Sequence, residues 1–309
     1  MYTTTSRDPL VHTYSVVAVD ETAGEMGVAV QSHYFSVGSV VPWAEAGVGV
    51  IATQSVVNVD FGPEGLKLLR NGSSPTEAVS ALLSRDEQRD YRQLAIAAPG
   101  YDVAVHTGAK CIPDAGHTLH PRFSVQANLM RSRDVWPAMA EVFTATEAPL
   151  AERLMRALEA AEQAGGDIRG RQSAAILIVG TEASGHVMED RRLDLRVEDH
   201  PEPLPELRRL INVRRAYDHA SRGDDALARG DFAEATAEFE AADALQPENL
   251  ELRYWRALTL AGNGNDAEAE RLLKAIYLED ESWRELTRRL ATTDLAPLSE
   301  EEMNRLAKL

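Results

Sequence analysis

The sequence is poor in the features that mark secreted and membrane-spanning proteins. Its only cysteine is Cys111, so no disulfide can form within the chain, which fits a reducing cytoplasm. No apolar run approaches the roughly 20 residues that span a bilayer. Residues 1–12 contain no apolar segment typical of a secretory signal. We therefore expect a cytoplasmic protein that does not engage a membrane.

Basic residues are scarce relative to acidic ones. The chain of 309 residues has 32 Lys and Arg against 49 Asp and Glu, a formal net charge of −17 at pH 7. Nucleic acids and anionic membranes are bound by clustered Lys and Arg, so the composition argues against both as partners. A phosphate-binding glycine motif is also lacking, because the Gly-Val-Gly-Val of residues 47–50 is typical of a strand without a following helix start. We expect no cofactor.

The first half of the chain mixes strand and helix patterns. Several β-rich runs are apolar at nearly every position, and such strands need cover on both faces. Ser74 is a predicted helix N-cap before Pro75, and Pro99-Gly100 is a predicted hairpin turn. Strands are predicted over 13–20, 26–32, 37–55, 92–108 and 172–180, and helices over 61–72, 73–86 and two within 134–164. This order predicts an α+β fold, a four-layer α/β/β/α sandwich.

The second half is Ala-rich and predicted to be all-α. The proline-rich stretch 198–210 is typical of a linker that ends in a helix start. After it, small and aromatic residues recur with a period of about 34 residues, as in tetratricopeptide repeats, strongly over 216–249 and weakly over 250–283. A closing helix is expected around 284–308. The predicted domains are an extension (1–12), a sandwich (13–200) and a repeat domain (201–309), the last serving partner or self-association.

Four segments of the first half resemble one bacterial and archaeal family. They are residues 13–55, 106–117 ("HTGAKCIPDAGH"), 125–130 ("VQANLM") and 165–179 ("GGDIRGRQSAAILIV"). Together they are similar to the domain of unknown function 1028 family, which is placed by fold among the N-terminal nucleophile hydrolases. The resemblance implies the layered sandwich and the hydrolysis of a small amide or peptide-like substrate.

The resemblance also makes Thr13 the candidate nucleophile. In this superfamily the first residue of the mature chain attacks a carbonyl, and its α-amine, with a pKa of about 8, acts as the base. Twelve residues precede Thr13, so the His12–Thr13 bond must be cut first. The alternatives are a later true start, a propeptide, an uncleaved chain that is inactive as a hydrolase or active through another residue, or a Thr that merely begins a strand. Hydrolysis is favoured if the Thr13 hydroxyl lies in a cleft with the leading residues draped loosely over it.

Two further residues complete the predicted catalytic set. A histidine can act as a base near neutral pH, so His33 could assist Ser32 or Thr13, although it and its neighbour Ser32 point to opposite faces of a strand. Asn128 lies two positions after Gln126, so on a strand both amides face one side and can donate to an oxyanion or substrate. The same amides can instead form the hydrogen bonds that the polar groups of a buried loop need.

The predicted substrate-binding set draws on several strand ends and one turn. Arg171 can bind a substrate carboxylate through two hydrogen bonds, or it can pair internally with Asp167. The set comprises Ser32, Gln54, Gln126, Asp167 and Arg171.

A histidine-rich segment offers a different chemistry. The segment contains four residues of types that bind zinc, His106, Cys111, His117 and His120, but their spacing matches no standard zinc finger. The simpler interpretation is that the turns of this segment form the wall of a pocket. Cys111 could act with His117 as a nucleophile or be an inert buried thiol. Three functions therefore compete: N-terminal nucleophile amide hydrolysis, which we favour, a non-catalytic binding or scaffold protein, and metal-assisted hydrolysis. We also expect a homo-oligomer.

Overall fold

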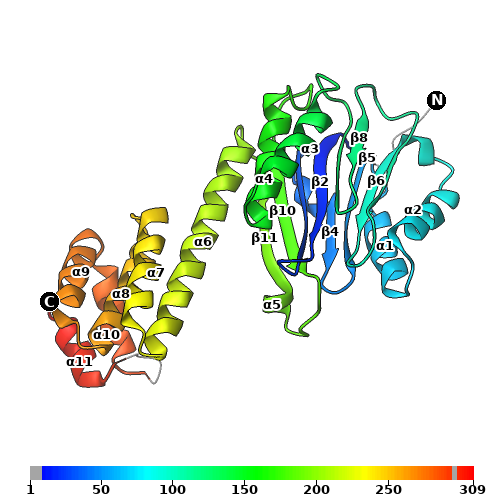
Figure 1. The fold of residues 1–309 in the computed structure, drawn as a ribbon. Coiled ribbons are helices and arrows are strands. Elements are labelled where there is room, and N and C mark those ends of the chain that lie inside the picture. Colours follow the sequence, from blue (N-terminus) through cyan, green and yellow to red (C-terminus); the bar gives the residue numbers. More distant parts are fainter. Residues whose placement is uncertain (1–8, 294–297) are drawn as a thin grey trace. The chain divides into compact units, whose positions relative to one another are not determined.

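The computed structural model describes residues 9–293 and 298–309. The chain divides into two compact units, the first ending at Arg209 and the second spanning Leu210–Leu309. The first contains two antiparallel sheets with helices, and the second is helical (Figure 1). The predicted mixture of strands and helices followed by a helical region is therefore confirmed. In the described ranges, no helix is long and apolar enough to cross a membrane.

Strands distant in sequence form the two sheets. One has the order β1-β5-β6-β7, with β4 also pairing β5, and the other has the order β11-β10-β3-β2-β9-β8. The first sheet contains β1 (Leu10–Val11), β4 (Pro42–Glu45), β5 (Gly49–Val56), β6 (Arg92–Ala97) and β7 (Ala104–Thr107). The second contains β2 (Thr13–Asp20), β3 (Glu25–Ser32), β8 (Gly116–Leu119), β9 (Phe123–Ala127), β10 (Ser173–Gly180) and β11 (Arg191–Val197).

Both faces of the central strands are covered. Helices α1 (Phe61–Arg70) and α2 (Pro75–Ser84) contact the first sheet, and α3 (Val135–Ala145) and α4 (Leu150–Gln163) contact the second. Figure 1 shows the two helix pairs on opposite sides of the strands. The remaining faces of the sheets contact each other through β2 and β3 against β5, around a cluster that includes Val17, Val28 and Val50. This double cover is why these strands are apolar on both sides.

Local sequence signals set several element boundaries. Ser74 caps α2 and forms a capping box with Glu77, as the sequence predicts. The turn between β6 and β7 contains Gly100 at a φ of 77°, a conformation that suits glycine. Several elements have no counterpart among the predicted ones, including β1, β8, β11 and the helix α5 (Val187–Asp190).

The helical unit differs from the sequence prediction at its end. The predicted linker 198–210 contains a helix start, as expected, because α6 (Pro203–Ala228) begins inside it, and proline is tolerated in the first turn of a helix. The single closing helix is wrong, since two helices occupy its place and 294–297 lie outside the described residues. The unit continues with α7 (Phe232–Leu245), α8 (Leu250–Gly262), α9 (Asp266–Glu279), α10 (Ser282–Leu290) and α11 (Glu300–Leu306).

A close approach of α6 and α7 explains one repeat glycine. A Cβ added at Gly223 would lie 2.7 Å from the ring of Phe239, which is buried. Any side chain at this position would force the aromatic ring or the helix to move. A small residue and an aromatic residue of the repeat pattern thus meet where α6 and α7 approach each other.

Candidate functional site

Thr13 is the first residue of β2, and it is buried rather than exposed in a cleft. It pairs with Ser32 in the β2–β3 register, and its side chain is fully inaccessible. The hydroxyl Oγ1 donates a hydrogen bond to the carbonyl oxygen of Val11 at 2.9 Å. In the intact chain, therefore, a substrate in solvent cannot reach the hydroxyl.

The residues just before Thr13 are part of the folded unit. Leu10 and Val11 form β1, in which Val11 pairs with Ser55 of β5, and both Val11 and His12 are buried. Residues 10–12 therefore do not lie loosely over Thr13, which is the arrangement that would favour hydrolysis. The reason is that β1 completes the edge of one sheet while β2 begins the other, so the chain crosses between the sheets at residue 12.

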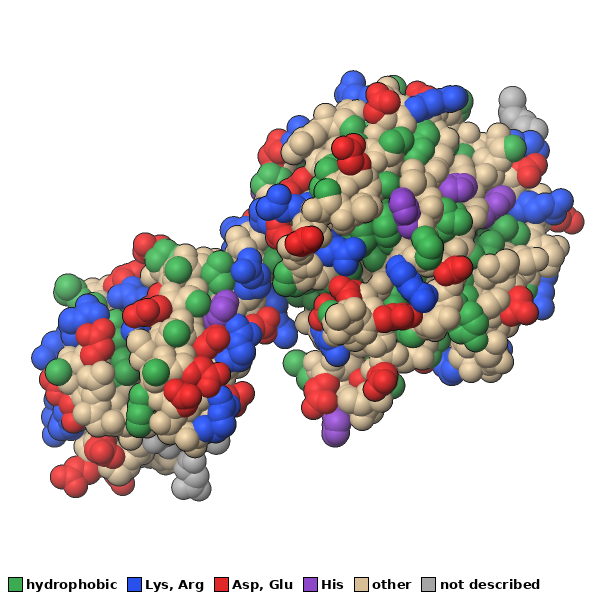
Figure 2. All heavy atoms as spheres, viewed as in Figure 1, with side chains coloured by type: hydrophobic (Ala, Val, Ile, Leu, Met, Phe, Trp, Pro, Cys, Tyr) green, Lys and Arg blue, Asp and Glu red, His purple; other side chains and the backbone are tan. Residues whose placement is uncertain are grey.

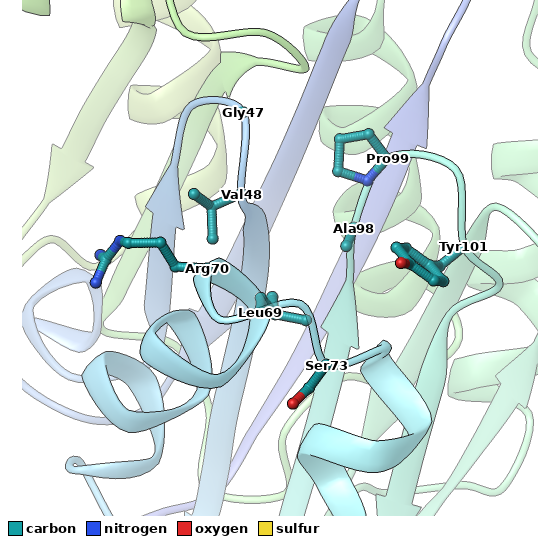
Figure 3. Close-up of a pocket in the computed structure, with 8 residues that line it drawn as sticks. All are labelled: Gly47, Val48, Leu69, Arg70, Ser73, Ala98, Pro99 and Tyr101. Atoms are coloured by element: carbon teal, nitrogen blue, oxygen red, sulfur yellow. The ribbon is translucent and has the colours of Figure 1, made fainter.

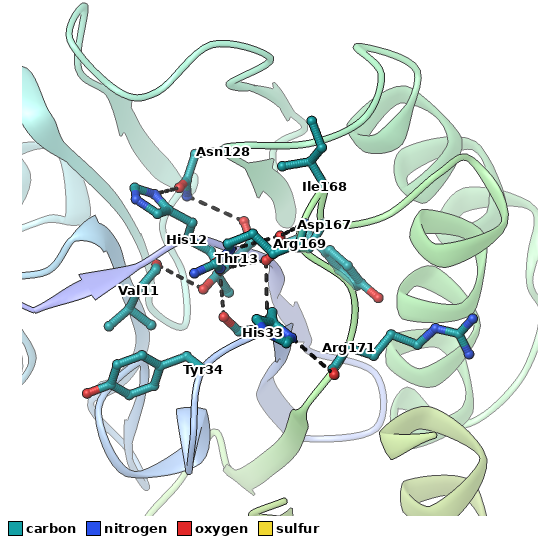
Figure 4. Close-up of polar contacts among 12 residues, drawn as sticks. Val11, His12, Thr13, His33, Tyr34, Asn128, Asp167, Ile168, Arg169 and Arg171 are labelled. Atoms are coloured by element: carbon teal, nitrogen blue, oxygen red, sulfur yellow. Dashed lines mark hydrogen bonds and ion pairs between the residues drawn. The ribbon is translucent and has the colours of Figure 1, made fainter. Parts of the chain in front are cut away.

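The carbonyl oxygen of His12, which belongs to the peptide bond preceding Thr13, accepts two hydrogen bonds. Ser32 Oγ donates at 2.6 Å and Arg169 Nη2 at 2.8 Å (Figure 4). One donor is a hydroxyl at the end of β3 and the other a guanidinium from the turn after α4. Two such donors polarise a carbonyl and stabilise negative charge that develops on its oxygen.

Asp167 holds the Arg169 side chain in this position. Its carboxylate accepts from Arg169 Nε at 3.1 Å and Nη2 at 2.7 Å, and also from the backbone N–H groups of Arg169 and His33. The two hydrogen bonds make the Asp167–Arg169 pair bidentate. Because the Asp167 side chain is fully buried, the pair is also shielded from water on the side of the carboxylate. Gly170, at a φ of 111°, lets the chain turn back directly after Arg169.

The alternative pairing of Asp167 with Arg171 is wrong. Arg171 forms ion pairs with Glu162 and Glu202 instead. Glu162 in turn accepts from the buried Tyr14 hydroxyl at 2.8 Å, and burial together with this carboxylate raises the pKa of Tyr14 well above 10. Arg171 thus lies at the exposed end of a chain of contacts that starts inside the second sheet.

His33 does not contact either hydroxyl that it was predicted to assist. Its side chain is exposed, and ring Nδ1 lies 3.2 Å from the carbonyl oxygen of Arg171, to which it can donate. Figure 4 shows the ring beside Arg171. Ser32 Oγ donates instead to the His12 carbonyl oxygen. His33 therefore marks the solvent side of the site.

A network of buried amides joins the two sheets below Thr13. Gln126 Nε2 donates to Ser15 Oγ at 2.6 Å, and Ser15 Oγ donates to Gln54 Oε1 at 2.7 Å. Gln93 Oε1 accepts from Gln54 Nε2 at 2.7 Å and from Asn128 Nδ2 at 2.9 Å. Gln126 lies on β9, whereas Asn128 follows the last residue of that strand, and the amides of both are already engaged within the protein. Gln93, which joins three strands through this network, has no sequence signal beyond its place in an apolar run.

Asn128 connects the network to His12. His12 Nδ1 lies 2.7 Å from Asn128 Oδ1, and because an amide oxygen only accepts, Nδ1 carries the proton. Burial lowers the pKa of His12, opposed by the Asn128 hydrogen bond. In the part of the chain that the structure describes, Nε2 is buried without a hydrogen-bond partner. A neutral imidazole thus precedes Thr13.

The histidine-rich segment does not assemble a metal site. Among the described residues, no group of three or more His, Cys, Asp or Glu side chains could hold a metal ion. His117 lies 2.9 Å from Thr107 Oγ1, His106 contacts the Arg89 carbonyl, and His120 stacks on Phe123. Metal-assisted hydrolysis at these residues is therefore not supported.

Cys111 is likewise not arranged as a nucleophile. Its thiol donates to the carbonyl oxygen of Arg92 at 3.4 Å rather than to His117, and burial raises its pKa. A raised pKa keeps the thiol protonated, which is the inert form.

Cavities in the described part of the first unit lie near the sheets. One of about 340 Å³ is lined by Thr107, Cys111, Asp114 and Arg133 among others, and Thr107 Oγ1 accepts from Gln93 Nε2 at 2.9 Å. The cavity therefore borders the amide network. Another, of about 230 Å³, lies between the end of α1 and the β6–β7 turn (Figure 3). Its lining includes none of the predicted site residues, and Arg70 within it is paired with Glu45.

Comparison with known proteins identifies the first unit. The model of a family described as "Family of unknown function (DUF1028)" matches residues 13–207, beginning at Thr13. The chain belongs to the DUF1028 family. A tetratricopeptide repeat model matches residues 226–290. The resemblance of both halves to known families, as predicted from the sequence, is therefore confirmed.

One solved structure supports this DUF1028 assignment. It is a crystal structure of a protein from Silicibacter pomeroyi whose title names the same family model. The two chains are 31% identical, with a TM-score of 0.58, over 65% of this chain and 88% of the other. A search of curated proteins found no match.

Proposed function

We propose that this DUF1028 protein is the precursor of an amide hydrolase, in which cleavage of the His12–Thr13 bond turns Thr13 into an N-terminal nucleophile. The observation that carries the proposal is the pair of donors, Ser32 Oγ and Arg169 Nη2, on the His12 carbonyl oxygen. This oxygen gains negative charge if its carbonyl carbon is attacked. The match to the DUF1028 model from Thr13 onward supports the same boundary.

The cleavage proceeds in two balanced steps. The Thr13 hydroxyl oxygen attacks the His12 carbonyl carbon, a C–O bond forms, the C–N bond between the residues breaks, and the hydroxyl proton moves to the Thr13 nitrogen. Water then hydrolyses the resulting ester, leaving a His12 carboxylate and a free Thr13 amine. That amine, with a pKa of about 8, can deprotonate the hydroxyl in later turnovers.

The mature site would reuse the groups already in place. Ser32 and Arg169 would face the carbonyl oxygen of a bound amide, because the substrate would occupy the position that the His12 carbonyl vacates. Asn128 would hold Thr13 through the Thr13 carbonyl oxygen, to which its backbone N–H donates at 3.1 Å. The two helix pairs covering two stacked sheets support the four-layer sandwich of N-terminal nucleophile hydrolases as the frame of this site.

The remaining predicted residues take different roles in this proposal. His33 and Arg171, on the solvent side, would contact a small amide or peptide-like substrate, with Arg171 exchanging an ion pair for a substrate carboxylate. Asp167 would act through Arg169. Gln54 and Gln126, which are bonded to Ser15, would form the floor of the site rather than bind substrate directly.

The test is the mass of the purified protein after incubation. The wild-type chain should yield a fragment that begins at Thr13, Thr13→Ala should stay intact, and Arg169→Gln should cleave at least tenfold more slowly. Arg131→Gln is the matched control, since the Arg131 side chain donates to the backbone carbonyl of Ile168 rather than to Asp167 or His12, and it should leave cleavage unchanged. A chain that stays intact at residue 12 and shows no amide turnover would overturn the proposal.

One observation favours a second function, a non-catalytic binding or scaffold protein. The Thr13 hydroxyl is fully buried and already bonded to Val11, so the intact chain has no accessible nucleophile at this position. The tetratricopeptide repeats suggest interaction with a protein. In this case Thr13→Ala would leave partner binding intact and deletion of 210–309 would abolish it. Light scattering would test the expected homo-oligomer.

A further inference from the structure

The helical unit contains a cavity between the helices of its first repeat and the next helix. It measures about 250 Å³ and is lined by residues of α6, α7 and α8. The lining residues are Tyr217, Ala220, Ser221, Asp224, Phe239, Glu251, Leu252, Trp255 and Arg256. This volume is below that of typical small-ligand pockets, which span about 300–1,000 Å³, and suits one side chain better than a whole ligand.

Among the residues that the structure describes, no cation pairs with either of two carboxylates in this lining. Asp224 accepts a hydrogen bond from Thr259 Oγ1 at 3.2 Å, and Glu251 accepts one from the Tyr217 hydroxyl. Partial burial, with Asp225 beside it, raises the pKa of Asp224 against the effect of the Thr259 hydrogen bond. Both carboxylates are therefore held by neutral hydroxyl groups.

Their neighbours in the helical unit are mostly neutralised. Figure 2 shows acidic and basic side chains interspersed over this unit, and many of them are paired. Glu238 pairs with Arg222, and Asp243 pairs with Arg256, so the one arginine in the cavity lining already has an anionic partner. The cavity therefore offers unneutralised negative charge.

Aromatic side chains stand beside these carboxylates. Trp255 is 38% exposed and Tyr217 is 37% exposed, while Phe239 and Leu252 form buried walls. Indole and phenol rings attract cations through their electron-rich faces, most strongly where water is excluded. Exposed aromatic rings next to free carboxylates are the combination that binds a long cationic side chain through both its charge and its methylenes.

We propose that this cavity binds a Lys or Arg side chain of a protein partner, with Glu251 and Asp224 facing the cation and Trp255 and Tyr217 covering its alkyl part. The inference is independent of the proposed hydrolysis, because every residue it uses lies in the helical unit. The proposal predicts that the partner segment is positively charged, whereas the match to the repeat family alone predicts no charge for a partner.

The experiment uses the full-length chain and short synthetic peptides. The probe is acetyl-Ala-Leu-Lys-Leu-Ala-amide, with norleucine or glutamate in place of lysine in two comparison peptides, and Kd is measured by isothermal titration calorimetry. We expect the lysine peptide to bind at least tenfold more tightly than either comparison peptide. Its Kd should rise with salt, since the contact is between charges near the surface.

Matched variants localise the contact. Glu251→Gln and Asp224→Asn should each raise the Kd of the lysine peptide at least fivefold. Glu248→Gln, the same change of charge at an exposed position outside the cavity, should change it less than twofold. Far-UV circular dichroism checks that each variant is folded, and Trp255→Phe provides an independent variant that keeps both carboxylates but should still weaken binding.

Several outcomes would overturn the proposal. They are equal binding of the norleucine or glutamate peptide, no binding of the lysine peptide at millimolar concentration, or equal effects of Glu248→Gln and Glu251→Gln. Sedimentation velocity tests a further outcome that would overturn it. If the wild-type chain is a dimer and Glu251→Gln is a monomer, a second copy of the chain occupies the cavity instead.

Discussion

Replacing Arg169 with glutamine should destabilise the first unit strongly. The substitution removes two side-chain hydrogen bonds to the buried Asp167 carboxylate and one to the His12 carbonyl oxygen. Leaving a buried charge without its partner costs about 3–5 kcal/mol. The Arg169 side chain is 30% exposed, so water can replace part of the contact, and two backbone N–H groups remain on Asp167. We therefore expect a loss of about 3 kcal/mol in the free energy of unfolding.

The assay is urea denaturation followed by tryptophan fluorescence. Trp255 and Trp283 are first replaced by phenylalanine, so that Trp43 and Trp136 report on the first unit alone. Arg131→Gln is the control and should change the free energy of unfolding by less than about 0.5 kcal/mol, as surface substitutions do.

A double-mutant cycle isolates the pair. Asp167→Asn combined with Arg169→Gln should lose about 1.5–2 kcal/mol less than the sum of the single variants, because the second change removes a partner that is already missing. Strict additivity, or an Arg169→Gln variant as stable as Arg131→Gln, would refute the assignment of Arg169 as the cation that neutralises Asp167.

Three further predictions address other parts of the chain. Gly223→Ala should lower the free energy of unfolding of the helical unit by about 1–3 kcal/mol, because its Cβ would meet the Phe239 ring, and an unchanged urea midpoint would contradict this contact. Ser74→Ala should cost about 1 kcal/mol by removing the capping box of α2, measured by thermal denaturation. Because burial holds the pKa of His12 below 6.5 in the folded state, the unfolded chain binds the proton more readily. The stability that His12 contributes is present above pH 6.5 and is lost as the pH falls from there toward its folded pKa. His12→Gln should therefore lose less stability than wild type between pH 7.5 and 5.5, and equal losses would contradict this role.

Local sequence signals predicted much of the fold. The Ser74 cap, the Pro99-Gly100 turn and the β-branched run that starts at Thr13 each depend on a few adjacent residues, and the structure contains all three. These features need no knowledge of the rest of the chain.

Features that depend on distant partners were not predictable in the same way. The edge strands β8 and β11 are partly exposed and carry polar residues, so their patterns resemble loops, and β1 has only two residues. The choice of Arg169 rather than Arg171 as the partner of Asp167 depends on the turn at Gly170 and on Glu162 from α4. The role of Gln93 emerges only when three strands meet.

The amides between the sheets also bear on how this domain could be redesigned. A wholly aliphatic interface would let one sheet slide over the other by a residue at little loss, since Val and Ala contacts are interchangeable. The donor and acceptor atoms of Gln54, Gln93 and Asn128 match in only one relative position of the two sheets. A shift of one sheet by a residue would therefore leave several buried polar atoms without hydrogen-bond partners. Replacing these amides with aliphatic residues could raise the melting temperature. It would also remove the contacts that fix the position of one sheet relative to the other, and with it the arrangement in which β1, β3 and the turn after α4 meet at the His12–Thr13 peptide bond.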